Sequence, residues 1–273
     1  MCEGNRKRIT YDSVHNPRYN DKRNVGWYQN MEYMKYWPGA RFMYVFKGGD
    51  LNSAAHLLAE SMKEPFQMFP FASVAVQQSV RDEFIERVRC RFRQLKPHVV
   101  LHPNFERSAD ILRNGDKKYI VADCKDAPPF ASPILVPNVT HLHFGSGASG
   151  VVTVHSFRTF REAANMFLNE SPPFEVVHVF DEKVTSVYSI AKRIRCVEFF
   201  VNCSDVCLLP ILPHFAMKKP RTVIFNNYHF ETLKLGDHWR IIVFPISNNI
   251  SHPCCCAQFG NCTCYLTGGD CCE

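Results

Sequence analysis

Strand and helix signals alternate along residues 151–201, and this alternation constrains the fold more than any other feature of the chain. The order of the predicted elements is strand 151–157, helix 160–168, strand 176–180, helix 184–194 and strand 199–201. Successive strands that are joined by helices run parallel, because antiparallel neighbours need only a short hairpin turn. The chain is therefore predicted to be an α/β protein built on a parallel sheet.

Shorter signals upstream extend the same pattern. The further predicted elements are strand 42–46, helix 51–62, strand 74–76 and the short strands 119–122 and 134–136. Residues 79–82 (SVRD) resemble a capping box, which predicts the start of another helix. One stripe of that helix is expected to be buried, and it consists of Val80, Phe84, Val88 and Phe92.

Composition divides the chain into three parts. Residues 1–35 are polar and basic, residues 36–245 contain the predicted elements, and residues 246–273 are rich in cysteine. With 46% hydrophobic and 21% charged residues among 273, the chain can form a sizeable core. No apolar run reaches about 18 residues, so no transmembrane span is predicted. The charged N-terminus lacks the apolar core of a secretory signal, so a cytoplasmic location with reduced thiols is expected.

The net charge of +6 is partly concentrated in the first 23 residues. A basic tail can attract nucleic acid or an anionic membrane surface. No aromatic residues are interleaved with these charges in a helical stripe, as they often are in nucleic-acid-binding segments. We therefore expect a solvated tail and no nucleic-acid partner.

Cysteines gather in the last part of the chain. The candidate metal ligands there are Cys254, Cys255, Cys256, Cys262, Cys264, Cys271 and Cys272. Clustered thiolates bind zinc or Cu(I), and adjacent cysteines are also typical of palmitoylation sites. Their spacing differs from that of zinc fingers, so a tail without either function is the third interpretation. His141 and His143 form a second candidate zinc pair, or a plain loop pair, since no third ligand is apparent.

Several segments together resemble aldehyde dehydrogenases. Residues 151–164 (VVTVHSFRTFREAA) resemble the family segment that follows the Glu-x-Phe-Gly-Pro motif, and 200–206 (FVNCSDV) resemble the strand that closes this unit. Residues 130–135 (FASPIL), 71–77 (FASVAVQ) and 50–54 (DLNSA) resemble further parts in the same order. The resemblance covers roughly residues 36–245. It implies the catalytic-domain half of that family, without most of the nucleotide-binding half.

The resemblance also implies where the reactive groups belong. In that family a cysteine thiolate attacks the aldehyde, hydride passes to NAD(P), and a glutamate activates water. The nucleophile position falls on or beside Met68, and no cysteine occurs between Cys2 and Cys90. A methionine thioether cannot form a thiolate. The general-base position falls on Tyr36 or, with a four-residue shift, on Glu32.

The family motif that holds the nicotinamide ribose is altered as well. Its glutamate and phenylalanine positions fall on Ser146 and Ala148, so NAD(P) is the cofactor implied by the family while its contacts are replaced. Cys90 lies between two arginines, which could lower its pKa and supply another thiolate. The alternative is that Cys90 is a packed helix residue.

Family members associate through a C-terminal strand that joins the sheet of a partner. Residues 239–245 (WRIIVFP) occupy the corresponding place and alternate as a strand does. An exposed strand of this kind pairs readily with another chain. A homo-oligomer, or association with an intact family member through residues 239–245, is therefore expected.

The sequence thus predicts an aldehyde dehydrogenase-like protein that is catalytically inactive and acts by protein association. One alternative is an NAD(P)-dependent oxidoreductase that acts on aldehydes through residues not identified by these motifs. Another is a metal-binding protein whose activity resides in the cysteine-rich tail.

Overall fold

The computed structural model describes residues 39–122, 129–145 and 147–246. The predicted basic segment 1–35 and the seven tail cysteines lie outside the described residues, as do Tyr36, Glu32 and Ser146. Within the described residues, no helix is long and apolar enough to cross a membrane.

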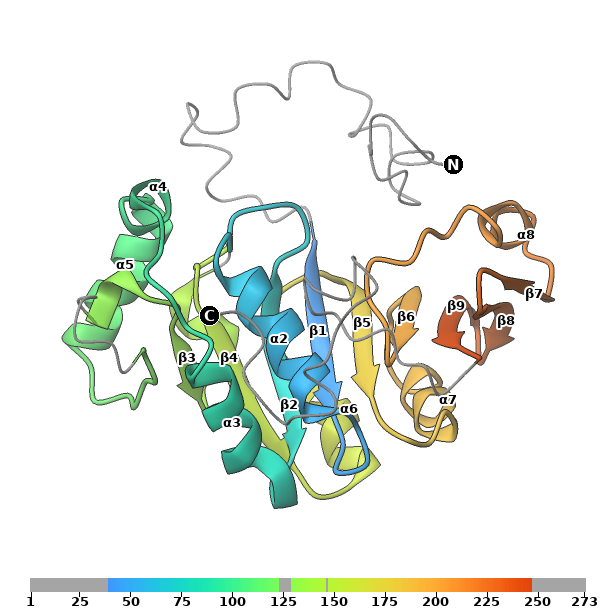
Figure 1. Cartoon of the computed structure of the whole chain (residues 1–273), viewed down its shortest axis with the longest axis horizontal. Helices are drawn as coiled ribbons and strands as arrows, with labels where there is room; N and C mark the ends of the chain where they lie inside the picture. The colour runs from blue at the N-terminus through green and yellow to red at the C-terminus, as the bar shows by residue number, and fades with distance from the viewer. Residues whose placement is uncertain (1–38, 123–128, 146, 247–273) are drawn as a thin grey trace, which may run out of the picture.

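The described chain forms one nine-stranded sheet with helices on both faces (Figure 1). The strands are β1 (Ala40–Val45), β2 (Phe71–Gln77), β3 (Leu135–Pro137), β4 (Val152–Phe157), β5 (Phe174–Phe180), β6 (Glu198–Val201), β7 (Arg221–Phe225), β8 (Tyr228–Leu235) and β9 (His238–Pro245). The α-helices are α2 (Leu51–Met62), α3 (Arg81–Arg89), α4 (Pro97–Val100), α5 (Pro103–Arg113), α6 (Phe160–Asn169), α7 (Thr185–Ala191) and α8 (Leu212–Ala216). Short 3-10 turns are η2 (Gln78–Val80), η3 (Pro129–Ala131) and η4 (His141–Phe144).

The sheet has a long parallel part and a short antiparallel part. Its strand order is β3-β4-β2-β1-β5-β6-β9-β8-β7, and all neighbours from β3 to β9 run parallel. Only β8 and β7, at one end, run antiparallel to their neighbours. The α/β class and the mostly parallel sheet agree with the prediction from the sequence.

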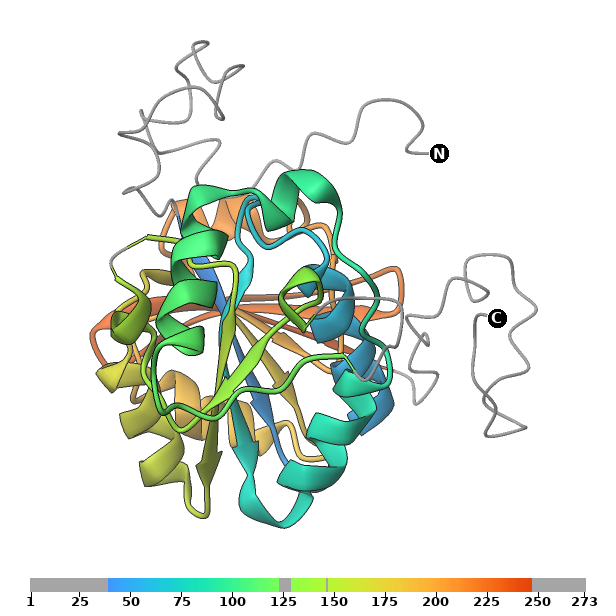
Figure 2. The ribbon, with the colours of Figure 1, turned by 90° about the vertical axis from the view of Figure 1, so that its left-hand side faces the viewer.

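The sheet is sandwiched between two helical layers (Figure 2). Helices α2 and α3 pack on one face against the inward side chains of β1, β2 and β4. Helices α6 and α7 pack on the other face, mainly against β1, β5 and β6. The central strand β1 is therefore covered on both faces, as its nearly continuous apolar sequence favours.

The strands and helices predicted over 151–201 all form. Thr159 caps α6, because its Oγ1 accepts a hydrogen bond from the Glu162 backbone N–H at 3.2 Å. Strands β4 and β5 are parallel but not adjacent, since β2 and β1 lie between them. The separation of β4 from β5 in the sheet depends on pairing with distant segments of the chain, which local periodicity does not predict.

Three local predictions are wrong. Residues 79–82 form no capping box, because Ser79 lies in η2 and α3 begins after Val80 with no side-chain cap. Residues 119–122 form no strand and contribute only one bridge, from Ile120 to Leu135. The segment 239–245 lies in β9, which is paired on both sides, with β6 and with β8. It therefore has no free edge with which to join a partner's sheet.

Candidate functional site

The segments to which the family resemblance assigns the site meet at the amino ends of neighbouring parallel strands. Gly39 precedes β1, Met68 and Phe69 precede β2, and Gly150 precedes β4. Strands β4, β2 and β1 are parallel neighbours, so their amino ends lie at the same edge. Segments far apart in the sequence are thus brought together where the resemblance expects chemistry.

These segments touch through aromatic rings and glycines. A Cβ placed on Gly39 would lie 2.6 Å from Cε1 of Phe69. A Cβ placed on Gly150 would lie 2.9 Å from Cζ of Phe66 and 2.7 Å from Cδ2 of Phe105. Gly150 also has a φ of +79°, which side-chain-bearing residues rarely adopt. Close packing against rings therefore requires glycine at residue 150.

Met68 lies beside this packed edge and is 46% exposed. Its neighbour Phe69 turns inward and is buried. Ala148 is partly buried, and its carbonyl accepts a hydrogen bond from the Asn104 side chain at 2.9 Å. Met68 therefore presents a thioether where the resemblance expects a thiol, and Ala148 presents a methyl group where it expects a phenyl ring. The positions at which it expects a carboxylate, Tyr36 or Glu32 and Ser146, lie outside the described residues.

Three of the four described cysteines, Cys90, Cys196 and Cys203, have thiols whose pKa is raised. Desolvation, followed by the hydrogen bond to Glu86 3.4 Å away, raises the pKa of Cys90; Arg89 and Arg91 act to lower this pKa but are outweighed. Cys90 is exposed, so its interpretation as a packed helix residue is wrong. Burial raises the pKa of the Cys203 thiol to about 12 and raises the pKa of Cys196 strongly. A thiol with a raised pKa is a poor nucleophile near neutral pH.

A buried polar network links β2, β4 and α6 next to the same edge. The hydroxyl of Ser149 lies 2.9 Å from Nε2 of His141, and both side chains are buried. The Thr153 hydroxyl donates its proton to the Glu170 carboxylate at 2.9 Å and can accept a hydrogen bond from the Ser73 hydroxyl, 2.7 Å away. Buried polar groups are retained where hydrogen bonds satisfy them, as they do for Ser149, Thr153 and Glu170.

Glu170 is the centre of this network. Its carboxylate accepts hydrogen bonds from the His141 backbone N–H at 2.7 Å, from Thr153, and from Nε2 of His155 at 2.5 Å. Burial acts to raise the pKa of Glu170, but these hydrogen bonds outweigh it, so the pKa is lowered. The carboxylate stays ionised and holds the end of α6 against β4 and η4.

The network is not a catalytic triad. Glu170 accepts from the backbone of His141, while its side-chain partner is His155. Burial lowers the pKa of His141 to about 4, so its ring is neutral at physiological pH. Ser149 is only 1% exposed, and a substrate carbonyl cannot reach its hydroxyl. The arrangement orders the loop before β4 and has no accessible nucleophile.

Sequence reasoning missed this network and assigned His141 differently. The two histidines are not on one face of an extended segment, because η4 buries His141 and leaves His143 exposed. In the described ranges, no cluster of three or more His, Cys, Asp or Glu residues could hold a metal ion. A signal was present in β4, where the polar residues Thr153 and His155 are two positions apart and so lie on the same face of the strand.

Comparisons with known proteins give a family and a set of similar folds. Residues 36–250 match the model of a family described as "Protein of unknown function (DUF1487)". No curated protein matches the chain. An NAD-dependent benzaldehyde dehydrogenase from Corynebacterium glutamicum is similar at 13% identity and a TM-score of 0.49, covering 63% of this chain and 41% of that structure. Lactaldehyde dehydrogenase from Escherichia coli is similar at 16% identity and a TM-score of 0.47, covering 62% and 40%. The chain thus spans less than half the length of these enzymes.

Proposed function

The chain belongs to the DUF1487 family of proteins of unknown function, and we propose that it is a non-catalytic protein with an aldehyde dehydrogenase-like fold that acts by associating with other proteins. The resemblance would place aldehyde chemistry at the amino ends of the parallel strands, where Gly39, Phe69 and Gly150 meet. The groups that this edge presents are therefore the main evidence on its function.

One observation carries the proposal: the segments that precede β1, β2 and β4 come together, but aromatic rings fill the space between them. Phe69 approaches Gly39, and Phe66 and Phe105 close on Gly150, at distances that leave no room for even one added carbon. The exposed side chain beside them is that of Met68, whose sulfur cannot be deprotonated. Aldehyde oxidation needs a thiolate and a base within reach of one carbonyl carbon. The described packing places the Glu175 side chain against Gly39, with its Cγ 2.7 Å from a Cβ built there, but the rings and the Met68 thioether supply no thiolate.

The association role rests on a different part of the molecule. Strand β7 lies at the end of the sheet, and only β8 pairs with it in the described chain. Ile224 and Phe225 on this strand are 68% and 52% exposed. Exposed edge strands with apolar side chains are typical sites of strand addition by another chain.

Cofactor binding and turnover can be measured in one sample to test the proposal. We expect no heat of binding when NAD or NADP is titrated into the purified full chain, and no NADH or NADPH when propanal is added. A working aldehyde dehydrogenase under the same conditions controls for the assay.

Steady NADH production would contradict the proposal, and the variant Cys90→Ser would then identify the source. Loss of that production in Cys90→Ser would assign the chemistry to the exposed Cys90 thiol at the C-terminal end of α3. A matched Cys207→Ser variant, which changes another exposed thiol, controls for nonspecific effects.

A further inference from the structure

The outer backbone edge of β7 is defined by its pairing with β8. A two-residue turn, Asn226-Asn227, joins the strands, and both residues have positive φ values of 48° and 62°. Such a turn places Phe225 and Tyr228 in a hydrogen-bonded pair. Because these pairs alternate along an antiparallel ladder, Thr222 and Ile224 direct their backbone N–H and C=O groups away from β8.

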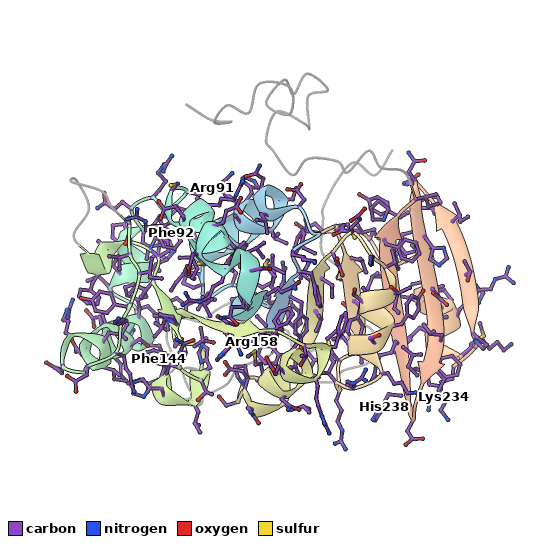
Figure 3. All side chains as sticks on the ribbon, turned by 90° about the horizontal axis from the view of Figure 1, so that it is seen from below. Arg91, Phe92, Phe144, Arg158, Lys234 and His238 are labelled. Carbon is purple, nitrogen blue, oxygen red and sulfur yellow. The ribbon has the colours of Figure 1, made fainter. Side chains whose placement is uncertain are left out.

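Little on the strand itself guards this edge. Arg221 is the single charged residue of β7, and Thr222, Val223, Ile224 and Phe225 follow it without a charge or a proline. Natural edge strands are usually protected by inward charges, prolines, bulges or covering segments. Figure 3 shows the β8–β9 hairpin, marked by Lys234 and His238, at the end of the molecule opposite Phe144, and β7 lies beyond β8 in the strand order.

We infer that β7 pairs antiparallel with β7 of a second copy of this chain, about a two-fold axis through Val223, to form a dimer with one continuous sheet. This inference rests on the proposed association role and names the surface and the partner. An isologous contact requires a patch that is complementary to itself. The β7 edge meets this requirement in its hydrogen bonds and in its charges.

The hydrogen bonds fit in a register centred on Val223. Thr222 then lies opposite Ile224 of the second copy, and these are the residues whose backbone groups point outward. Both copies contribute the same two residues, so two hydrogen-bonded pairs form around a central pair of Val223 residues that are not hydrogen-bonded to each other. A register shifted by one residue would place Val223, whose backbone N–H and C=O point toward β8, opposite Thr222 or Ile224, whose backbone groups point away from β8.

The charges fit in the same register. Arg221 lies opposite Phe225 of the second copy, where its guanidinium can pack on the exposed ring. The two Arg221 residues are four positions apart along the strand direction, or about 13 Å. This separation exceeds the screening length of about 8 Å at physiological salt, so their repulsion is weak.

Sedimentation of the full chain under reducing conditions, across a range of concentrations, tests the inference. We expect a monomer–dimer equilibrium that shifts to dimer as concentration rises. Ile224→Pro removes an outward N–H without removing a bond to β8, so it should be monomeric throughout. Ile224→Thr keeps the N–H and should still dimerise, although more weakly. Circular dichroism establishes that both variants remain folded.

A cross-link gives a second, positive test. Residues opposite each other in a non-hydrogen-bonded pair have Cα atoms about 4.5 Å apart, within reach of a disulfide. Val223→Cys should therefore form a disulfide to its own copy on mild oxidation, and mass spectrometry should find a peptide joined to itself through position 223. Arg221→Cys, about 13 Å from its copy by the strand rise, should not.

Two results would overturn the inference. One is a wild-type chain that stays monomeric at every concentration, and the other is an Ile224→Pro variant that dimerises like the wild type. Neither result bears on the absence of catalysis, which only NADH production contradicts. The dimer and the proposed function can therefore fail separately.

Discussion

Strands β1 and β7 have similar residues and opposite environments. Both combine one arginine with β-branched, aromatic or other apolar side chains. β1 is paired on both edges and covered on both faces, so all of its residues are buried except Arg41. β7 is paired on one edge, and four of its five residues are exposed. Position in the sheet, more than composition, decides whether such a strand stabilises the fold or presents a surface.

The same contrast separates the two parts of the molecule that could act. At the amino edge of the parallel strands, rings and glycines are in contact and the polar groups are hydrogen-bonded to one another. At the antiparallel end, no other described strand pairs with the outer edge of β7, and the apolar side chains of Ile224 and Phe225 are exposed. We call the packed amino ends of β1, β2 and β4, with the Glu170 network, the closed part of the molecule, and the outer edge of β7 its open part. The closed part stabilises the fold, and the open part is the surface proposed for association.

The largest expected effect comes from truncating the core of β1. Phe42 is fully buried and packs against Phe167 and Phe174, with ring centroids 5.2 and 5.0 Å away. Phe42→Ala should lower the free energy of unfolding by about 3–5 kcal/mol, because it removes a buried ring and leaves a cavity. Urea denaturation followed by fluorescence or circular dichroism measures this change. A loss below about 1 kcal/mol would show that β1 is not the centre of the core.

Acid should weaken the closed part through His141. Its pKa is lowered from 6.5 to about 4 in the fold, so the unfolded chain takes up the proton first as pH falls. Stability should be complete above about pH 6.5 and decline toward pH 4, by about 3 kcal/mol at most. Denaturation curves at pH 7, 6 and 5 measure the slope.

Substitution identifies the group responsible for that slope. His141→Gln should flatten the dependence between pH 7 and 5, whereas His143→Gln, a change at the exposed neighbour, should leave it unchanged. Glu170 adds its own loss only at lower pH, because its pKa is below the usual 4.5. An unchanged slope in His141→Gln would contradict the buried, neutral ring.

Glu170→Gln should have an intermediate effect. The amide keeps the shape but loses the charge that strengthens the bonds from His155, Thr153 and the His141 backbone. We expect a loss of about 2 kcal/mol in the free energy of unfolding. Glu162→Gln, on the exposed first turn of α6, is the matched control and should change stability much less. Equal losses of stability in the two variants would show that the Glu170 charge does not stabilise the buried network.

The smallest effect on the isolated chain should come from Phe225. This ring on β7 is 52% exposed, so Phe225→Ala should change the free energy of unfolding at low protein concentration by less than about 0.5 kcal/mol. The same substitution should weaken dimerisation, because Arg221 of the second copy loses the ring opposite it. Denaturation and sedimentation of one preparation measure both. A stability loss comparable to that of Phe42→Ala would erase the contrast between β1 and β7.

The sequence predicted which helices and strands form better than it predicted which strands pair with one another. Helical and strand periodicities are local, so α6, β5 and β6 were predictable from their own residues. The insertion of β2 and β1 between β4 and β5 depends on pairing across more than 70 residues, which periodicity does not encode. The interior place of β9 escaped prediction for the same reason, because a strand's own sequence does not state how many of its edges are paired.

The candidate site was predictable in outline only. The resemblance identified the segments around Met68 and Ala148, and the structure places these segments at one edge of the sheet. Which groups fill that edge depends on rings from elsewhere, such as Phe105 on α5. The network of Glu170 joins residues from four separate segments, and in the sequence only the spacing of Thr153 and His155 indicated it.

Hydrogen–deuterium exchange at several protein concentrations tests the contrast between the closed and open parts most directly. Amides of β1 should be strongly protected at every concentration. Those of Thr222 and Ile224 should exchange quickly in dilute samples and become protected as concentration rises. Protection of the Thr222 and Ile224 amides that is already complete at the lowest concentration, or absent at the highest, would contradict the account of β7 as an edge that a second copy covers.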